Sequence, residues 1–388
     1  MTIRTAEKRA LFVFSSKHVY GSELSLLPVV RSLGASWKPY FLVEGAGPLD
    51  TFLRKEGFPV YRLPVNLDAL RHQRVGRALR LLRLVYLLYS RRIQLVHVNF
   101  HFHAPLISTA CSVVGIPIVV HVRNMIDYPV ASKFRKYDGI ICISQAVRNN
   151  LVTQGKVPSC EIAERLWIIP DGRDLAPFHA GNRDRVRGEF GLDPATPLVG
   201  MAARITSMKG QDIFLQIAAL VKKRVPAARF LLVGSTLDEL DEHYLQDLQV
   251  LVADLGLQKD VIFAGYRDDM PDILAAMDCF VHPSRRGAFV SVLIEAMASG
   301  LPIVASDVDG IPECVGCDGA AVLLPPDDPA AWADTVVRIL ADKNLANRMV
   351  EKGRGRTSSL FDIAPLARQT NEVLETVYES YHTDGGFL

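Results

Sequence analysis

The sequence predicts an α/β protein with two doubly wound, parallel sheets, and three observations support this fold class. Short apolar runs alternate with helix-length segments along the whole chain. Most of these runs are continuously apolar, as expected for parallel strands that are covered on both faces. More than a dozen such runs are present, which is too many for one ordinary open sheet. A chain of 388 residues is also long enough for two or three domains.

The predicted strands are divided evenly between the two halves of the chain. In the first half we expect strands at residues 10–14, 39–43, 60–63, 95–99, 118–122, 139–143 and 166–169. In the second half we expect them at residues 198–202, 229–233, 261–264, 279–282, 303–305 and 321–324. Helical segments separate most of the strands, which is typical of βαβ units. A final helix is predicted at residues 363–381.

A segment rich in Pro, Gly, Asp and Arg at residues 170–197 predicts the boundary between the two domains. We therefore expect domains at residues 1–177 and 178–388, with the final helix able to pack back toward the first. Ligands of doubly wound sheets bind outside the carboxyl ends of the strands, so a cleft between the domains is the expected site.

The charge is distributed unevenly, although the formal net charge is only +2. Residues 1–177 contain 24 Lys and Arg against 12 Asp and Glu, whereas residues 178–388 contain 20 against 30. Such asymmetry indicates different partners for the two halves. The overall composition, with 49% apolar and 22% charged residues, excludes wholesale disorder.

Much of the basic excess lies in a predicted helix at residues 70–92, which contains no acidic residue. Its arginines are Arg71, Arg74, Arg77, Arg80, Arg83, Arg91 and Arg92. One helical face carries Val75, Ala78, Leu79, Leu82, Val85 and Tyr86. A basic helix with surplus apolar surface suits peripheral contact with an anionic membrane. A helix packed on the sheet with a solvated arginine face is the equal alternative, and nucleic-acid binding is disfavoured because no aromatic platform accompanies the arginines.

Membrane-spanning and secreted classes are disfavoured. The uncharged stretch 93–122 contains several polar residues and two prolines, so we interpret it as strand, helix and strand. The apolar run 10–14 is too short for a signal peptide. Six scattered cysteines are expected to be reduced thiols. The expected location is the cytoplasm or the inner face of the cytoplasmic membrane.

Residues 279–313 concentrate the candidate chemistry. A strand at 279–282 leads through a loop of small residues into a helix that begins near Val290 and ends at Gly300. Free N–H groups and the positive end of the helix dipole make such a junction an anion site. Glu295 lies one turn deeper and could accept hydrogen bonds from a ribose diol, or could merely solvate the helix.

Two further loops follow predicted strands. Arg204 and Lys209 flank a loop at residues 200–210, where two cations could converge on one anion or remain solvated. Gly21 and Ser22 follow the first strand, where the glycine permits close approach of a ligand or simply makes a turn.

Taken together, these segments resemble glycosyltransferase family 4 (glycosyl transferases group 1), the retaining enzymes of the GT-B fold. The resemblance runs in order along nearly the whole chain. Its segments are Gly21–Glu23, Val96–Asn99, Val119–His121, Ile143–Gln145, Ile168–Gly172, Arg204, Lys209–Gly210, Phe263–Gly265, Pro283–Ser284, Glu295–Ala305 and Gly310–Glu313. The run from Glu295 to Ala305 is the most specific.

The resemblance implies two facing Rossmann-like domains with a deep cleft and a nucleotide-sugar donor on the second. It implies that Arg204 and Lys209 hold the diphosphate and that His121 faces the transferred sugar. The implied donor-binding residues are Gly21, Ser22, Gly265, Tyr266, Arg267, Ser284, Gly287, Ala288, Phe289, Val290, Ser291, Val292 and Glu295. The implied reaction is retaining transfer, without a cofactor, to a glycan or lipid-linked acceptor in surface polysaccharide, lipopolysaccharide or glycolipid synthesis.

Several residues depart from the family pattern. The first of two glutamates that the family usually carries is Gly287, and flanking glycines are Ala288 and Val290. An asparagine is replaced by Asp171 and a glycine by Asp309. The absent glutamate normally contacts sugar hydroxyls, so a non-catalytic nucleotide-sugar binder remains an alternative. A nucleotide-sugar epimerase on the same fold is a further alternative, against which the Glu295 run and the two cations argue.

Two details near the gap at position 287 carry hypotheses of their own. Arg285 and Arg286 could favour an acidic or otherwise unusual donor sugar, or could belong to a solvated loop. Asp307-Val308-Asp309 spells the triplet with which a different glycosyltransferase fold binds a divalent metal. Here the triplet overlies the family's glycine loop, so we expect no catalytic metal.

Overall fold

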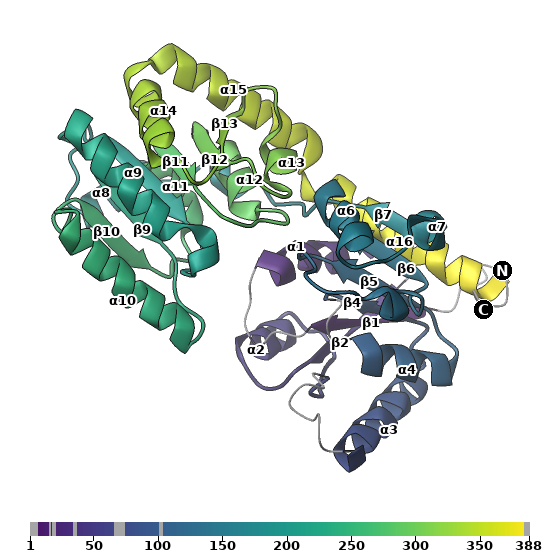
Figure 1. The fold of residues 1–388 in the computed structure, drawn as a ribbon. Coiled ribbons are helices and arrows are strands. Elements are labelled where there is room, and N and C mark those ends of the chain that lie inside the picture. Colours follow the sequence, from purple (N-terminus) through teal and green to yellow (C-terminus); the bar gives the residue numbers. More distant parts are fainter. Residues whose placement is uncertain are drawn as a thin grey trace. The chain divides into compact units, whose positions relative to one another are not determined.

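The computed structural model describes residues 7–14, 17, 21–33, 37–65, 74–100 and 104–383. The chain forms two compact units, of which unit 1 contains Met1–Gly172 and Ile363–Leu388, and unit 2 contains Arg173–Asp362 (Figure 1). Both units are parallel α/β sheets, so the predicted fold class is confirmed. All thirteen predicted strands are present, and most differences lie at their ends.

The boundary between the units differs from the predicted one. It falls between Gly172 and Arg173 rather than after residue 177, and the final helix belongs to unit 1. The backbone N–H of Arg173 donates to the carbonyl of Phe361 at 2.9 Å, so the two connecting segments run beside each other. A Cβ at Gly172 would lie 2.8 Å from Ile363 Cδ1, and only glycine allows this close approach.

Unit 1 contains a seven-stranded parallel sheet with the order β3-β2-β1-β4-β5-β6-β7. Its strands are β1 (Lys8–Phe14), β2 (Trp37–Val43), β3 (Val60–Arg62), β4 (Leu95–Val98), β5 (Ile118–Val122), β6 (Gly139–Cys142) and β7 (Leu166–Ile168). Strand order reverses between β1 and β4, which makes this the topological switch point of the sheet.

The helices of unit 1 connect these strands and cover the sheet. They are α1 (Gly21–Arg31), α2 (Pro48–Lys55), α3 (Arg74–Ser90), α4 (Ala104–Val114), α5 (Ala131–Phe134), α6 (Gln145–Thr153), α7 (Ser159–Ile162) and α16 (Ile363–Thr383), with a 3-10 turn at Ala163–Arg165. The last helix, α16, packs beside α1 and contributes Leu374 to a core that includes Phe12 and Phe41. Residues 93–122 form strand, helix and strand, as predicted.

Unit 2 contains a six-stranded parallel sheet with the order β10-β9-β8-β11-β12-β13. Its strands are β8 (Leu198–Ala202), β9 (Arg229–Val233), β10 (Val261–Gly265), β11 (Cys279–His282), β12 (Ile303–Ser306) and β13 (Ala321–Leu324). Its helices are α8 (Arg183–Glu189), α9 (Gln211–Arg224), α10 (Glu239–Asp254), α11 (Met270–Ala276), α12 (Ser291–Ala298), α13 (Ile311–Val315), α14 (Pro329–Ala341) and α15 (Lys343–Leu360), with 3-10 turns at Ala176–His179 and Ser207–Lys209. Here the strand order reverses between β8 and β11.

Both faces of the second sheet are buried. On β8, Leu198 packs into a cluster that contains Leu293 of α12, whereas the next residue, Val199, packs into a cluster that contains Phe214 of α9. Because successive side chains point to opposite faces, a strand covered on both sides must be apolar throughout. This explains why the apolar runs of the sequence located the strands.

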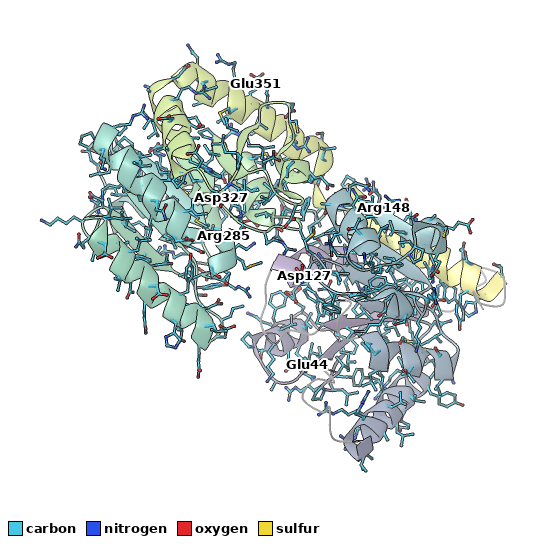
Figure 2. The ribbon with its side chains drawn as sticks, viewed as in Figure 1. Glu44, Asp127, Arg148, Arg285, Asp327 and Glu351 are labelled. Atoms are coloured by element: carbon cyan, nitrogen blue, oxygen red, sulfur yellow. The ribbon has the colours of Figure 1, made fainter. Side chains whose placement is uncertain are left out.

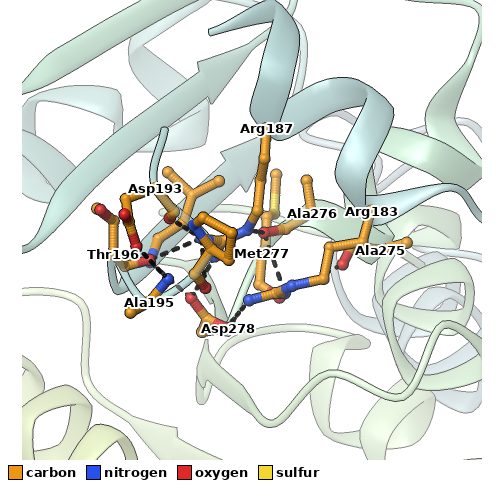
Figure 3. Close-up of polar contacts among 11 residues, drawn as sticks. Arg183, Arg187, Asp193, Ala195, Thr196, Ala275, Ala276, Met277 and Asp278 are labelled. Carbon is orange, nitrogen blue, oxygen red and sulfur yellow. Dashed lines mark hydrogen bonds and ion pairs between the residues drawn. The ribbon is translucent and has the colours of Figure 1, made fainter. Parts of the chain in front are cut away.

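A polar network around the buried Arg187 holds the amino ends of β8 and β11 (Figure 3). Asp278 accepts hydrogen bonds from Arg183 Nη2 at 2.6 Å, from Arg187 Nη2 at 2.7 Å and from the backbone N–H of Leu198 at 2.8 Å. Arg187 also donates to the carbonyl of Thr196 at 2.9 Å. The network lies at the opposite end of the strands from their carboxyl ends, so its role is structural.

Helix α3 does not bury the apolar face that the sequence predicts. Leu84 and Leu88, which do not belong to that predicted face, are fully buried. The exposed fractions of Val75, Leu82 and Tyr86 are 75%, 65% and 73%, so most of the expected packing face meets solvent. The helix packs beside α4, which covers only a narrow stripe of the surface of α3. Residues 70–73 of the predicted basic helix lie outside the described residues. No helix in the described part of the chain is long and apolar enough to span a membrane.

Candidate functional site

The loops that follow β8 and β11 are bonded to each other at the switch point of the second sheet. The backbone N–H of Arg285 donates to the carbonyl of Met208 at 2.9 Å, and Ser284 Oγ donates to the same carbonyl at 3.1 Å. Gly210 has φ +74°, and a Cβ there would lie 2.1 Å from the carbonyl oxygen of Pro283. Both the left-handed backbone and the close approach require glycine at this position.

The two predicted cations lie at this junction. Lys209 is partly buried, and burial together with the neighbouring Arg204 lowers the pKa of its ammonium, whereas Asp309 opposes that shift. Arg204 is about half exposed, and its Nε lies 3.9 Å from Asp241 Oδ2. Two adjacent cations, of which one is desolvated, form a site that an anion would stabilise.

Helix α12 begins directly after the β11 loop, as the sequence predicts. Its first turn contains Ser291 and Val292, and the N–H of Val290 donates to Cys314 Sγ at 3.3 Å. The preceding Phe289 packs edge-on against Phe361, with ring centroids 5.8 Å apart. The β11 loop, which Ser284 and Arg285 bind to the carbonyl of Met208 in the β8 loop, thus leads into the amino end of α12.

Glu295 lies one turn further along α12 and is not a solvated surface residue. Its carboxylate is 15% exposed and pairs with Arg173, whose Nε lies 3.0 Å from Oε1. Burial raises the pKa of Glu295, and the Arg173 guanidinium acts in the opposite direction. The expectation that Glu295 merely solvates the helix is wrong.

Arg285 and Arg286 are both held in ion pairs with carboxylates of unit 2. Arg285, labelled in Figure 2, donates from Nη1 and Nη2 to Asp212 at 2.8 and 2.6 Å. Arg286 Nε donates to Asp309 Oδ2 at 3.2 Å. The two side chains are still 39% and 37% exposed, and each guanidinium charge is compensated by a carboxylate.

The predicted residues after β10 lie two strands away from β8 at one edge of the sheet. Gly265 has φ +65°, and the side chain of Tyr266 is 70% exposed. The guanidinium of Arg267 is engaged with Glu189 and Asp269. Any donor contact from this segment would therefore come from backbone groups or from the tyrosine.

In unit 1, Arg123 is the centre of a buried polar network that contains His121. Arg123 Nε donates to Asn99 Oδ1 at 2.8 Å, Nη1 contacts Ser25 Oγ at 3.2 Å and pairs with Asp171, and Nη2 lies 3.3 Å from His121 Nδ1. These residues, except Asn99, line one small pocket. The replacement of asparagine by Asp171 is thus matched by a buried arginine.

His121 is buried and neutral. Burial, Arg123 and His97 all lower the pKa of His121 well below its ordinary value. Because Arg123 donates toward Nδ1, we assign the ring proton to Nε2, which accepts or donates no hydrogen bond among the described residues. His97 lies edge-on to it with ring centroids 5.7 Å apart, and burial lowers the pKa of His97 to about 3.

The remaining predicted residues are partly described. Gly21 begins α1, the first helix after β1, and the side chain of Ser22 lies outside the described residues. Gly287 and Ala288 belong to the loop before α12. Among the described residues, no three or more His, Cys, Asp and Glu side chains are grouped closely enough to hold a metal ion. None of the six cysteines, all of which lie in the described part of the chain, forms a disulfide.

Sequence reasoning missed three contacts at these sites. Arg173 was not singled out, although it pairs with Glu295. Arg123 and Asp171 were not joined, because the partners lie on separate segments. Asp309 and Gly287 were both recognised as departures from the family pattern, but the hydrogen bond between them was not predicted. The loss of one carboxylate and the gain of another in the same sequence was the signal that could have indicated it.

Comparison with known proteins identifies the family. Residues 182–356 match the family model described as glycosyl transferases group 1. The lipopolysaccharide core biosynthesis mannosyltransferase LpsB of Rhizobium meliloti is 31% identical over 254 residues, which cover 64% of this chain and 68% of that relative. The chain belongs to the glycosyl transferases group 1 family. This confirms the predicted resemblance as far as membership of the glycosyl transferases group 1 family.

Two other curated relatives match over shorter regions. The D-inositol 3-phosphate glycosyltransferase of Nocardia farcinica is 33% identical over 194 residues, or 48% of this chain and 42% of the relative. Mannosylfructose-phosphate synthase of Agrobacterium fabrum is 30% identical and is covered over 48% of its length. The chain thus spans less than half the length of these two relatives.

Solved structures confirm the GT-B fold of this family member. Anabaena Alr3699/HepE in complex with UDP-glucose superposes with a TM-score of 0.81 at 22% identity, covering 95% of this chain and 99% of that chain. A glycosyltransferase from Rickettsia africae superposes with a TM-score of 0.84 at 18% identity, covering 96% and 99%. At such low identity the likeness concerns the fold.

Proposed function

We propose that this protein transfers a sugar, with retention of anomeric configuration, from a nucleoside-diphosphate donor to a glycan or lipid-linked acceptor. The observation that carries the proposal is the junction of the β8 and β11 loops, where Arg204 and Lys209 lie together and the β11 loop leads into α12. Membership of the family and the UDP-glucose bound by HepE support a nucleotide-sugar donor. Surface polysaccharide, lipopolysaccharide or glycolipid synthesis in the cytoplasm is the proposed context.

The proposed mechanism follows from the charges at this junction. Departure of a nucleoside diphosphate develops negative charge, which Arg204, Lys209 and the N–H groups at the start of α12 would stabilise. Preorganised donors of this kind contribute about 2.7–4 kcal/mol each to catalysis. We propose that no metal is needed, since these groups supply the positive charge. The departing phosphate oxygen would take the acceptor's proton on the face of attack.

Glu295 and His121 have proposed roles as binding groups. An ionised carboxylate at Glu295 would accept hydrogen bonds from the ribose diol, and Arg173 favours that ionised form. A neutral His121 with its proton on Nε2 would donate a hydrogen bond and would position the sugar rather than act as a base.

A donor panel tests the proposed activity. The protein is incubated with UDP-, GDP- and ADP-sugars, and hydrolysis or transfer is followed together with the anomeric configuration of the product. Turnover of one donor with retention is the expected result. Binding without turnover would favour the non-catalytic alternative raised by Gly287, and interconversion of the donor itself would favour an epimerase.

We also propose that α3 contacts an anionic membrane surface. Five large apolar side chains are exposed on this helix, namely Val75, Leu79, Leu82, Tyr86 and Tyr89. Arg77 and Arg83 are exposed on the same helix, which contains no acidic residue. Exposed apolar groups flanked by cations bind anionic bilayers through combined burial and charge.

Vesicle flotation tests the membrane contact. Binding to vesicles that contain anionic lipid is expected, with weaker binding at high salt and on neutral vesicles. Replacing Leu79 and Leu82 with serine should abolish flotation, whereas Leu240→Ser should not, because Leu240 is an exposed leucine on α10 of unit 2. Equal flotation of both variants would contradict the proposal.

A further inference from the structure

Asp309 has an unusual backbone conformation beside the proposed donor site. It follows β12 and has φ +49°, in the left-handed region that non-glycine residues rarely adopt. Only two other non-glycine residues in the described part of the chain, Arg92 and Lys156, have positive φ. Such a conformation persists only where the surroundings determine it, and it often occurs at binding sites.

The Asp309 carboxylate binds the position at which the family usually has a glutamate. Its Oδ2 accepts hydrogen bonds from the backbone N–H of Gly287 at 3.0 Å and from Arg286 Nε at 3.2 Å. The N–H of Gly310 donates to the carbonyl of Gly287 at 2.9 Å, which joins the same two loops again. These bonds fix the orientation of the carboxylate.

Position 287 has little room for a side chain of its own. A Cβ at Gly287 would lie 3.0 Å from Ile311 and 3.1 Å from Val290, which is tighter than ordinary contact. Thus, where the family has a glutamate and a glycine, this chain has a glycine at 287 and an aspartate at 309. The carboxylate that the family carries on residue 287 is therefore absent, and the Asp309 carboxylate, from the loop after β12, binds the backbone N–H of Gly287 instead.

One oxygen of this carboxylate is available to a ligand. Both hydrogen bonds end on Oδ2, and among the residues that the structure describes none donates to Oδ1. The Asp309 side chain is 19% exposed, so solvent or a ligand can reach it. Asp309 also interacts electrostatically with Lys209, which brings the carboxylate close to the proposed diphosphate site.

We propose that Asp309 determines donor-sugar specificity, with Oδ1 accepting a hydrogen bond from a hydroxyl of the transferred sugar. The inference rests on the proposed function and deepens it. Since Asp309 and Asp212 neutralise Arg286 and Arg285, the site favours a neutral, hydroxyl-bearing sugar over a uronic acid, whose carboxylate would be repelled. A site that accepts a hydroxyl hydrogen discriminates strongly against the corresponding deoxy sugar.

The experiment compares Asp309→Gly, which relaxes the backbone, and Asp309→Asn, which keeps the size of the side chain. Each variant is titrated with the nucleoside diphosphate alone, among UDP, GDP and ADP, that the unaltered protein binds best. Each is then assayed with the preferred neutral donor, its monodeoxy analogues and a uronic-acid donor. Asp327→Asn is the matched control, because Asp327 is an exposed residue of unit 2 (Figure 2).

The expected result distinguishes an effect on recognition of the sugar from an effect on binding of the nucleotide. Asp309→Gly should keep nucleoside-diphosphate affinity within about threefold, lower kcat/KM for the neutral donor by about 10–100-fold, and abolish the preference over one deoxy analogue. Asp309→Asn should retain part of that preference and reject the uronic-acid donor less strongly. If the protein binds donors without turnover, the ratio of dissociation constants replaces the ratio of kcat/KM.

Two other results would overturn the inference. An equal loss with every donor, or a parallel loss of nucleoside-diphosphate affinity, would assign Asp309 a structural role only. Unchanged donor preference in both variants would exclude a sugar contact. Failure of the unaltered protein to bind any nucleoside diphosphate or nucleotide sugar would instead refute the proposed function, and the inference with it.

Discussion

Arg173 and Glu295 form an ion pair in unit 2, with Arg173 Nε 3.0 Å from Glu295 Oε1. Both side chains are nearly buried, with exposed fractions of 10% and 15%. Burial disfavours the charged carboxylate, and the guanidinium favours it. The residue that begins unit 2 therefore maintains the acceptor that we propose for the ribose.

We predict that Arg173→Met weakens nucleoside-diphosphate binding by about 10–100-fold, because hydrogen bonds to charged groups contribute about 1.5–3 kcal/mol. Loss of the guanidinium raises the pKa of Glu295 further and favours the neutral carboxyl group. Calorimetry with the ribose nucleotide and its 2′-deoxy analogue measures the effect. The variant should no longer distinguish the two, and Arg338→Met, on the exposed face of α14, should behave as the unaltered protein. Unchanged discrimination would contradict the role of Arg173.

Arg204→Ala and Lys209→Ala are each predicted to lower kcat by about 10²–10³-fold, since each removes a preorganised positive charge from the leaving group. The measurement is steady-state kinetics with the donor that the panel identifies. Lys223→Ala is the matched control, because Lys223 is exposed at the end of α9. A loss of less than threefold for both site variants would refute the assignment of the diphosphate site.

Removal of divalent metal is predicted to leave activity unchanged. Asp309 of the Asp307-Val308-Asp309 triplet already binds Gly287 and Arg286, and the proposed cations supply the positive charge. Activity is measured after dialysis against EDTA, with and without added Mg²⁺. Complete loss in EDTA that Mg²⁺ restores would show that a metal takes part.

Stability is predicted to fall as the pH drops below about 6.5. Burial lowers the pKa of His97 and of His282 to about 3, and lowers that of His121 well below 6.5. Between about pH 6.5 and 3 the unfolded chain therefore binds protons that the folded chain does not, and the free energy of unfolding falls with pH. The slope is at most about 1.4 kcal/mol per pH unit for each histidine.

Urea unfolding at several pH values between about 7 and 5 checks this prediction. Carboxylates with lowered pKa values contribute mainly below about pH 4.5. Burial raises the pKa of Asp138 and of Glu295, which opposes the histidines in this window, so the decisive measurement is the change in slope when one histidine is replaced. His282→Phe should reduce the pH dependence of the free energy of unfolding, because Phe cannot bind a proton. A phenyl ring can also replace the imidazole that stacks on Phe280. His243→Gln, at an exposed position of α10, should not change that pH dependence. Stability that is constant or rising toward pH 5 would contradict the prediction.

Much of the fold was predictable because it depends on local pattern. In β8, β11 and β12 every position is buried, so these strands are almost entirely apolar and stand out between helical segments. The helix α3 was located correctly, yet the face that packs was not. Leu84 and Leu88 are buried because α4 lies beside them, and no periodicity within the helix encodes the position of a neighbouring helix.

The candidate site, like the fold, was predictable only in part. The sequence alone was enough to recognise the family run from Glu295 to Ala305, the cations Arg204 and Lys209, and the departures at 171, 287 and 309. The pairing of Arg123 with Asp171, of Arg173 with Glu295 and of Asp309 with Gly287 depended on the folded chain. Each pair joins segments that are distant in sequence, and burial makes an unpaired charge costly, so the partner is selected by three-dimensional proximity rather than by any local signal.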